Sequence, residues 1–367
     1  MLRLIGQQAD IDLSVFYLSD FSTRAYQDKE FGVDVTWDTD LTSGINHTVI
    51  RSNKSADEVS FFNPKVTVKD LFKQLDRQKW DAIWVHGYAN MGLMASIVYA
   101  RLRSIPIFLR GENNLTCSPS NWKKDVLMRW LIRNASALLY IGSANRSYYE
   151  AFGARPTQLF SMPYAVDNTF FQNPKPSEEP HLSSATAPVK FLYASKLTPR
   201  KNARLLVAAL AQLPIALRDQ AKLTIVGDGE ERTALTQDVQ ALQLGSHIEI
   251  LGFQNQSDMA RHLQDCDVFV LPSQKEPFGL VINEAMNAGK AILTTNEVGC
   301  AVDLVAPGVN GWVVKAGCLG SLVSAMQDAI EHRSQLALMG EASLARINQW
   351  SFAEDVIGLR AALERLN

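Results

Sequence analysis

The sequence predicts an α/β protein built from two doubly wound domains. Short apolar runs of strand length alternate with segments of helical periodicity in both halves of the chain. A stretch rich in Pro, Ser and Glu, residues 173–188, separates the two halves. The 367 residues, of which 47% are hydrophobic and 20% charged, provide enough apolar side chains for two cores.

Composition excludes several classes of protein. A formal net charge of −2 gives no overall attraction to nucleic acid, so we expect no nucleic-acid partner. The four cysteines lack CxxC or metal-finger spacing, which predicts reduced thiols and no metal site. Because no signal peptide or membrane-spanning apolar run is apparent, we expect a cytoplasmic protein, at most peripheral to the inner face of the membrane.

The first domain is placed at residues 1–172. We expect its strands at Ile11–Leu18, Ala82–His86, Ile105–Leu109, Ala137–Ile141 and near Gln158–Met162, and helices at Val68–Gln78, Gly92–Arg103, Trp122–Asn134 and Asn145–Phe152. Ligands of doubly wound sheets bind beyond the carboxyl ends of the strands. His86, Arg110 and Glu112 stand at or just after such ends, which makes them candidate ligand-binding residues. A lone histidine there also serves as a structural hydrogen-bonding group.

Two further segments of this domain allow two interpretations each. The Asp-rich loop at residues 31–46, with Trp37, suits a carbohydrate ligand or an ordinary surface turn. Trp122–Arg133 combines lysines and arginines with Leu127, Trp130 and Leu131 at helical spacing. Such a helix either contacts an anionic membrane peripherally or is a core helix with a solvated basic edge.

The second domain is placed at residues 189–348, after the linker at 173–188. We expect its strands at Lys190–Ala194, Leu223–Val226, Ile248–Ile250, Val268–Leu271, Ala291–Thr294 and Gly311–Val314. Helices are expected at Ala203–Leu213, Glu231–Leu242, Ser257–Cys266, before Gly289 and at Val302–Val305, with terminal helices after them. A last helix lies in residues 349–367.

The strand ends of this domain carry charges that suit a phosphorylated ligand. Lys196 and Lys201 follow the first strand, where two compact cations beside a helix start favour a diphosphate. Glu276 and Glu284 bracket the turn after Val268–Leu271. Carboxylates accept hydrogen bonds from hydroxyl groups, and a helix start attracts phosphate. The combination predicts a sugar nucleotide, although a single acidic residue in a first helical turn is also ordinary capping.

These motifs together resemble retaining glycosyltransferase family 4. The resemblance is carried by Ser195-Lys-Leu…Lys201, Ile225–Gly229, Leu251-Gly-Phe253, Leu271-Pro-Ser273 and Glu276–Gly289, and more loosely by Ile141-Gly142 and Pro163–Asp167. It implies the GT-B fold, with two Rossmann-like domains facing across a cleft, and a terminal helix that crosses back to the first domain. It also implies transfer of a hexosyl unit from a nucleotide diphosphate sugar to a hydroxyl acceptor (glycan, lipid or small metabolite), without cofactor or metal.

The resemblance also implies roles for individual residues. The catalytic set is Lys196, Lys201 and Glu276, and the donor-binding set is Gly227, Phe253, Phe278, Gly279, Leu280 and Glu284. In this scheme the lysines hold the diphosphate, Glu276 binds sugar hydroxyls and Glu284 binds the ribose. The N–H groups of residues 278–280 meet the phosphate and sugar, and Phe253 lines the base. His86, Arg110 and Glu112 lie on the acceptor side.

Three positions depart from the family pattern. The first strand and its Gly-rich loop have no evident counterpart, and Arg110-Gly-Glu112 stands where the family commonly has a histidine. Gly299-Cys300 replaces a Gly-Gly pair, with Asp303 where glutamate is frequent. The departures leave two alternatives to an active transferase: a catalytically weak or inactive subunit that binds a nucleotide sugar, and a GT-B epimerase that acts on the donor alone.

Overall fold

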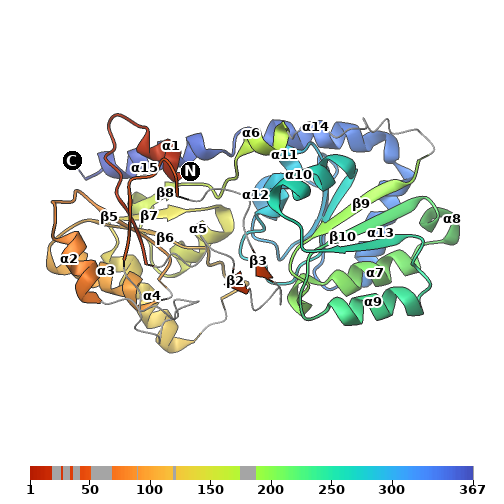
Figure 1. Ribbon diagram of the computed structural model, residues 1–367, viewed down its shortest axis with the longest axis horizontal. Helices are drawn as coiled ribbons and strands as arrows, with labels where there is room; N and C mark the ends of the chain where they lie inside the picture. Colours follow the sequence, from red (N-terminus) through yellow and green to blue (C-terminus); the bar gives the residue numbers. More distant parts are fainter. Residues whose placement is uncertain are drawn as a thin grey trace. The chain divides into compact units, whose positions relative to one another are not determined.

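The chain forms two compact units, each built around its own parallel sheet. In this computed structural model, residues 1–18, 26–27, 34–35, 42–50, 68–88, 90–118, 121–173 and 187–366 are described. The first unit comprises Met1–Tyr26, Thr39–Tyr164 and Phe352–Asn367, and the second comprises Gln27–Asp38 and Ala165–Ser351 (Figure 1). The expected α/β class with two parallel sheets is confirmed. Most of the 31–46 loop and of the expected linker lies outside the described residues.

The first unit has a four-stranded parallel sheet whose strands lie in chain order. They are β5 (Ile83–His86), β6 (Ile107–Arg110), β7 (Ala137–Tyr140) and β8 (Leu159–Ser161). Two short strands of this unit, β1 (Val15–Tyr17) and β4 (His47–Val49), pair in parallel. A separate pair is formed by β2 (Tyr26–Gln27) and β3 (Asp34–Val35), and β3 belongs to the second unit. The strand expected over Ile11–Leu18 is therefore shorter, because Ile11 and Leu13 pack against the core without joining a sheet.

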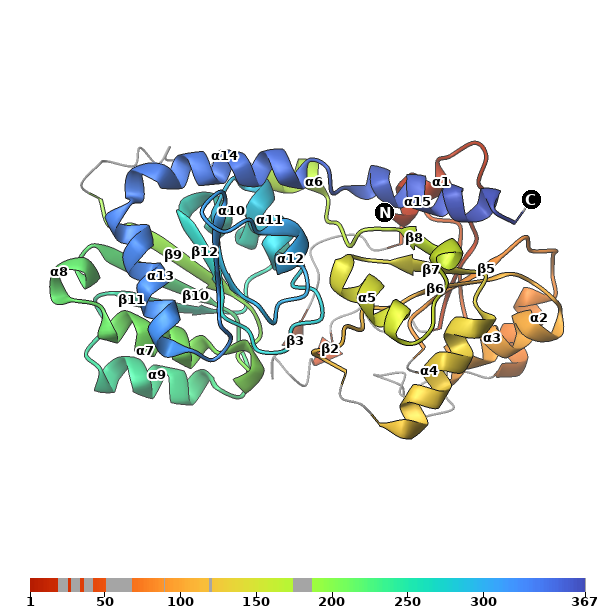
Figure 2. The same cartoon turned by 180° about the vertical axis from the view of Figure 1, so that it is seen from behind.

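Helices cover both faces of this sheet (Figures 1 and 2). One face packs against α2 (Val68–Leu75), α3 (Met91–Leu102), α4 (Trp122–Asn134) and α5 (Ser143–Ala151), and the other against α1 (Leu2–Gly6) and α15 (Phe352–Glu364). Side chains alternate between the faces: Leu109 joins the first core, and Phe108 joins the second with Leu359. All of β6 is buried, which explains its continuous apolar run.

The second unit has a six-stranded parallel sheet in the order β11-β10-β9-β12-β13-β14. The strands are β9 (Val189–Ala194), β10 (Ala221–Val226), β11 (Ile248–Gly252), β12 (Val268–Leu271), β13 (Ala291–Thr295) and β14 (Gly311–Val314). The order reverses between β9 and β12, which are neighbours in the sheet although two strands separate them in sequence. At such a switch point, the loops after the two strands diverge and leave room for a ligand at their carboxyl ends.

The helices of the second unit lie on both faces of its sheet (Figure 1). One face carries α7 (Ala203–Gln212), α9 (Arg232–Ala241) and α13 (Leu319–Glu331), and the other carries α10 (Gln256–Asp265), α11 (Val281–Asn287) and α14 (Leu336–Ile347). Shorter helices are α6 (Asn168–Gln172), α8 (Ile215–Arg218) and α12 (Ala301–Leu304). Phe191 and Tyr193 of β9 pack into the core on the α7 side. The central strands are thus fixed, and the loops at their ends hold the candidate site.

Candidate functional site

The loops after β9 and β12 are hydrogen-bonded to one another at the switch point. The loop after β9 contains a 3₁₀ turn, Pro199–Lys201, and ends at Asn202 with φ 58° and ψ 31°. The side-chain amide of Asn202 donates to the carbonyl of Pro272 at 3.2 Å. In return, the N–H of Gln274 donates to the carbonyl of Arg200 at 2.7 Å. These two bonds hold Lys201 beside the loop that carries Glu276.

Lys201 and Glu276 form a buried ion pair. Their exposed fractions are 9% and 8%, and Lys201 Nζ donates a hydrogen bond to Glu276 Oε2. Arg200 Nη1 lies 3.9 Å from the same carboxylate oxygen. Removing two charges from water costs several kcal/mol per ion, which their attraction offsets only in part. A fold gains little stability from such a pair, which makes Lys201 and Glu276 candidate site residues at the switch point.

The loop after β12 is held by backbone hydrogen bonds to the segment that follows β13. Glu276 N–H donates to Glu297 O at 3.1 Å, Gly299 N–H to Glu276 O at 3.0 Å, and Cys300 N–H to Phe278 O at 2.9 Å. Gly299-Cys300, which departs from the family pattern, thus supplies two of these three hydrogen bonds. Neither Glu297 nor Arg200 was predicted as a site residue, although Arg200 directly precedes the predicted Lys201.

Gly279 is required where the loop turns into α11. Its φ is +96°, and a Cβ at this position would lie 2.8 Å from Val298 Cγ1. Within the described part of the chain, the backbone N–H groups of Gly279 and Leu280 donate to no acceptor. Two unused donors one residue apart suit an anionic oxygen. The predicted donor-binding amides of these two residues therefore remain available.

The loop after β10 contacts the loop after β9 through Gly227. Its φ is +133°, and a Cβ would lie 1.9 Å from the carbonyl oxygen of Ser195, so no other residue fits. Gly227 N–H also donates to Gly252 O at 2.8 Å, at the end of β11. Phe253 follows directly and is partly buried. The Lys196 carbonyl accepts from the Tyr193 hydroxyl at 3.3 Å, which fixes the backbone beside this contact.

Glu284 and Phe278 lie in or beside α11. Glu284 is partly buried, and desolvation raises the pKa of its carboxyl group from 4.5 to about 7. Phe278 is 3% exposed, and its ring stacks on that of Trp350, with centroids 6.3 Å apart and planes at 30°. Phe278 therefore contributes its side chain to packing, which leaves only its backbone for the predicted ligand contact.

In the first unit, His86 is the last residue of β5, and Glu112 follows the carboxyl end of the adjacent strand β6. His86 of β5 is in register with Arg110 of β6, and both His86 and Glu112 are exposed. Partial desolvation and Arg110 lower the pKa of His86, while Glu112 raises it. Glu112 Oε1 accepts a hydrogen bond from the Tyr164 hydroxyl at 2.6 Å. The sequence placed these two residues at one edge of the sheet, where the structure has them.

Arg110, the third residue expected on this side, is enclosed. It is 1% exposed, and its Nη2 donates to Met162 O at 3.1 Å, to Pro163 O at 3.0 Å and to Asp355 Oδ1 at 3.2 Å. Desolvation lowers the pKa of Arg110 and raises that of Asp355, and the attraction between the two charges opposes both shifts. The guanidinium thus contacts α15 and two backbone carbonyls rather than solvent. Its partner is 245 positions away in sequence and was not predicted.

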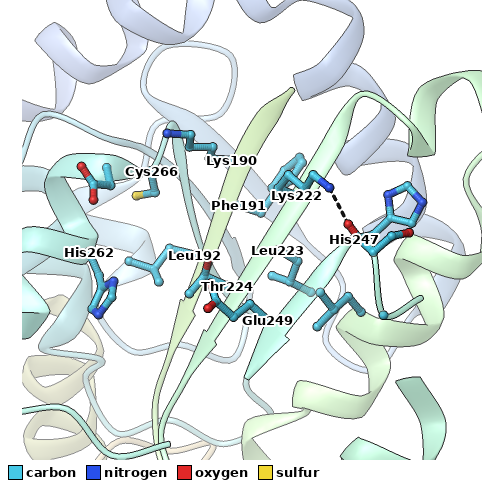
Figure 3. Close-up of a pocket in the computed structure, with 14 residues that line it drawn as sticks. Lys190, Phe191, Leu192, Lys222, Leu223, Thr224, His247, Glu249, His262 and Cys266 are labelled. Atoms are coloured by element: carbon cyan, nitrogen blue, oxygen red, sulfur yellow. Dashed lines mark hydrogen bonds between the residues drawn. The ribbon is translucent and has the colours of Figure 1, made fainter. Parts of the chain in front are cut away.

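A pocket of about 460 Å³ lies elsewhere in the second unit (Figure 3). It is lined by the amino-terminal halves of β9 and β10, including Lys190 and Lys222, together with His247 and with His262 of α10. The Lys222 ammonium donates to the carbonyl of Ser246 there. Because this pocket lies away from the carboxyl ends of the strands, it is separate from the Lys201–Glu276 pair.

The described residues include neither a metal-ligand cluster nor a membrane-spanning helix. Among them, no cluster of three or more His, Cys, Asp or Glu side chains could hold a metal ion. Likewise, none of the described helices is both long and apolar enough to cross a membrane. All four cysteines are free thiols.

Known proteins resemble the chain in sequence and fold. Across 176 residues it is 26% identical to an uncharacterized glycosyltransferase of Methanocaldococcus jannaschii, covering 48% of each chain. A second relative is the GDP-mannose-dependent monoacylated alpha-(1-6)-phosphatidylinositol monomannoside mannosyltransferase of Corynebacterium glutamicum. The two sequences are 28% identical over 81% of this chain and 79% of the relative. The chain spans 31% to 61% of the length of the first four relatives that it matches.

The fold comparison and the family model agree. A crystal structure of Anabaena HepE in complex with UDP superposes with a TM-score of 0.70 at 20% identity, over 88% of this chain and 87% of that one. Residues 175–346 match the family model described as glycosyl transferases group 1. That range contains Lys196, Lys201, Glu276 and Glu284. Residues 175–346 therefore belong to the glycosyl transferases group 1 family.

Proposed function

We propose that the protein is a retaining glycosyltransferase that moves a hexosyl unit from a nucleotide diphosphate sugar to a hydroxyl acceptor. The observation that carries this proposal is the buried Lys201–Glu276 pair at the switch point of the second sheet. A cation for phosphate and a carboxylate for sugar hydroxyls are the two groups that such a donor needs side by side. Relatives whose names include a GDP-mannose-dependent mannosyltransferase and an Escherichia coli alpha-1,3-galactosyltransferase support it.

The proposed roles follow from charge and position. Lys201, with Lys196 and Arg200, neutralises the diphosphate as it leaves, and the amides of Gly279 and Leu280 bind its oxygens. Glu276 binds hydroxyls of the sugar beside the anomeric carbon. Cations that stabilise the negative charge of the leaving group favour a dissociative, oxocarbenium-like transition state. This positive charge supplies what a metal ion would otherwise provide, so we expect transfer without a metal.

The remaining contacts concern the nucleoside and the acceptor. Glu284 accepts hydrogen bonds from the ribose, and Phe253 contacts the base. Of the acceptor-side residues, we assign His86 and Glu112 to the incoming hydroxyl because both are exposed at a strand end. The acceptor oxygen bonds to the anomeric carbon on the face that the diphosphate leaves. The electron pair of the broken C–O bond goes to the phosphate oxygen, which also takes the acceptor proton.

The experiment begins by finding the donor. A thermal-shift screen of UDP-, GDP- and ADP-sugars identifies it, because a bound ligand raises the unfolding temperature by mass action. With that donor, Lys201→Ala is expected to lower kcat/KM by about 2–4 kcal/mol of transition-state stabilisation, roughly 30- to 1,000-fold. Lys222→Ala, which removes an exposed lysine at the other end of the strands, is the matched control. Wild-type kcat/KM in Lys201→Ala would refute the proposal.

We also propose that α4 contacts an anionic membrane surface. Trp122, Val126 and Trp130 recur at every fourth position of this helix, and their exposed fractions are 72%, 61% and 40%. Lys123, Arg129 and Arg133 accompany them. Exposed aromatic side chains flanked by cations are typical of helices that lie in a membrane interface. A helix with merely a solvated basic edge would not need two exposed tryptophans.

Sedimentation with vesicles tests this contact. The wild-type protein is expected to sediment with vesicles that contain anionic lipid, and Trp122→Ser/Trp130→Ser to remain in the supernatant. Leu102→Ser removes a side chain that is 75% exposed on α3, and this control should sediment like the wild type. Absence of wild-type sedimentation, or equal losses in both variants, contradicts the proposed contact.

A further inference from the structure

We propose that Arg129, Arg133 and Arg155 form a second phosphate-binding site in the first unit. They line a pocket of about 260 Å³ together with Phe152, Gly153 and Gln158. The arginines come from α4 and from the residue that precedes the 3₁₀ turn Pro156–Gln158. This turn leads into the amino end of β8, whereas His86 and Glu112 lie at or just after the carboxyl ends of strands of the same parallel sheet. The pocket thus lies at the opposite edge of the sheet from the proposed acceptor contacts.

The charges of the pocket have one sign. None of its lining residues is acidic, and none of the three arginines makes an ion pair within the described part of the chain. The carboxyl ends of α4 and α5 lie nearby, and each helix dipole offsets about half a charge. Roughly two positive charges therefore remain uncompensated. A phosphate group, which carries up to two negative charges and accepts several hydrogen bonds, complements them.

A buried amide orients Arg155 toward the pocket. Gln158 is 3% exposed, and its side-chain nitrogen donates to Ile132 O at 3.2 Å and to Ala135 O at 2.6 Å. Its side-chain oxygen accepts from Arg155 N at 3.1 Å and from Arg155 Nε at 3.0 Å. The amide is thus fully hydrogen-bonded, and Arg155 is fixed through Nε while both Nη groups stay available for an anion. An arginine that only solvates the surface needs no such support.

A second arginine is fixed by an aromatic ring. The guanidinium carbon of Arg129 lies 5.6 Å from the centroid of the Phe152 ring, within the range of a cation–π contact. The side chains are therefore partly ordered before any ligand binds, which lowers the entropic cost of binding. The pocket volume suits a phosphate with a small substituent. That group could belong to a membrane lipid, next to the exposed tryptophans of α4, or to a soluble phosphate ester.

The test measures binding of defined phosphates away from the donor site. Isothermal titration with inorganic phosphate and with glycerol 3-phosphate is carried out on the Lys201→Ala protein, in which the proposed diphosphate site is weakened. Vesicles of phosphatidylcholine with and without phosphatidic acid are tested in parallel. Arg155→Gln is expected to weaken binding by about tenfold or more, the scale of losing one charged hydrogen-bond partner. Arg101→Gln, an exposed arginine of α3, is the control for net charge.

The binding results decide whether the three arginines form a phosphate site and which kind of phosphate it binds. Saturable binding of the soluble phosphates that is lost in Arg155→Gln supports the site with a soluble ligand. Binding confined to phosphatidic acid vesicles supports a lipid phosphate when it too is lost in Arg155→Gln, because α4 by itself is expected to contact anionic vesicles. No saturable binding of any probe, or equal weakening in Arg155→Gln and Arg101→Gln, overturns the site. Arg129→Gln provides a second variant if Arg155→Gln fails to fold. Because the comparison uses first-unit variants, its result does not depend on whether the proposed transfer activity is correct.

Discussion

Glu284 lies where its charged form is disfavoured. Desolvation raises the pKa of this carboxyl group from 4.5 to about 7, so in the folded state it still binds a proton at pH values where the unfolded chain has released it. The free energy of unfolding therefore falls as pH rises from about 4.5 to 7, and the loss is complete above that window. A group that costs stability at neutral pH is expected where a ligand, rather than the fold, uses it.

Glu284→Gln tests this cost. At pH 8 the variant is expected to be more stable than the wild type by about 1–3 kcal/mol, because it lacks the desolvated charge. At pH 5, where the wild-type carboxyl is mostly protonated, the two should differ little. Urea unfolding at both pH values measures the difference, with the exposed Glu249→Gln as control. An equal effect of Glu284→Gln at pH 5 and pH 8 contradicts the assigned desolvation.

Three residues show how far the sequence could predict the candidate sites. Lys201 and Glu276 were identified because each follows a predicted strand, and the adjacency of β9 and β12 brings them into contact. Arg110 also follows a predicted strand, but in the structure it is the last residue of β6 and is buried against Asp355. The position of a residue along the chain indicates the edge of the sheet it reaches. Whether its side chain meets solvent or another element depends on packing between segments far apart in sequence.

At the scale of elements, α15 depends on two contacts with the sheet of the first unit. Gly358 lets the helix approach β8 closely, since a Cβ there would lie 1.7 Å from the carbonyl oxygen of Ser161. Asp355, on the same buried face, pairs with Arg110 of β6 at 3.2 Å. Helical periodicity predicts a terminal helix, but an acidic residue on its packed face can be explained only once its partner is known.

Removing Asp355 alone should destabilise this unit strongly. Asp355→Ala leaves the Arg110 charge buried without a partner, which is expected to cost about 3–5 kcal/mol. The double variant Arg110→Met/Asp355→Leu removes both charges and should recover most of that loss. Urea unfolding of the full chain measures both, and Glu364→Ala, an exposed acid of α15, is the control. A loss below about 1 kcal/mol in Asp355→Ala would show that the pair does not anchor the helix.

The first strand illustrates a limit of sequence patterns at this scale. Alternating apolar residues predicted a strand over Ile11–Leu18, but only Val15–Tyr17 pairs with a neighbour. Ile11 and Leu13 pack against the core beside α15 without strand partners. Hydrophobic periodicity reports which side chains are buried, and backbone pairing is a separate requirement. By contrast, Trp122–Asn134 and Val268–Leu271 have the predicted bounds, because capping residues or an uninterrupted buried run delimit them.

For the whole molecule, alternating strands and helices were sufficient to predict two parallel α/β sheets. Parallel strands buried on both faces produce continuous apolar runs that stand out from the amphipathic helices between them. The order of the strands does not follow from that alternation. In the second unit, the reversal between β9 and β12 places the loops with Lys201 and Glu276 side by side. The candidate site therefore depends on the strand order, which brings together two residues that the sequence had already identified as candidates.

Calorimetry with one nucleoside diphosphate and its sugar ester tests the central claim most directly. According to this claim, Lys201 binds the diphosphate and Glu276 binds the sugar. Lys201→Ala is expected to weaken both ligands by about tenfold or more. Glu276→Gln should weaken only the sugar ester and leave the affinity for the nucleoside diphosphate unchanged or increased. Wild-type affinity for the nucleoside diphosphate in Lys201→Ala, or equal loss of both ligands in Glu276→Gln, would contradict the account.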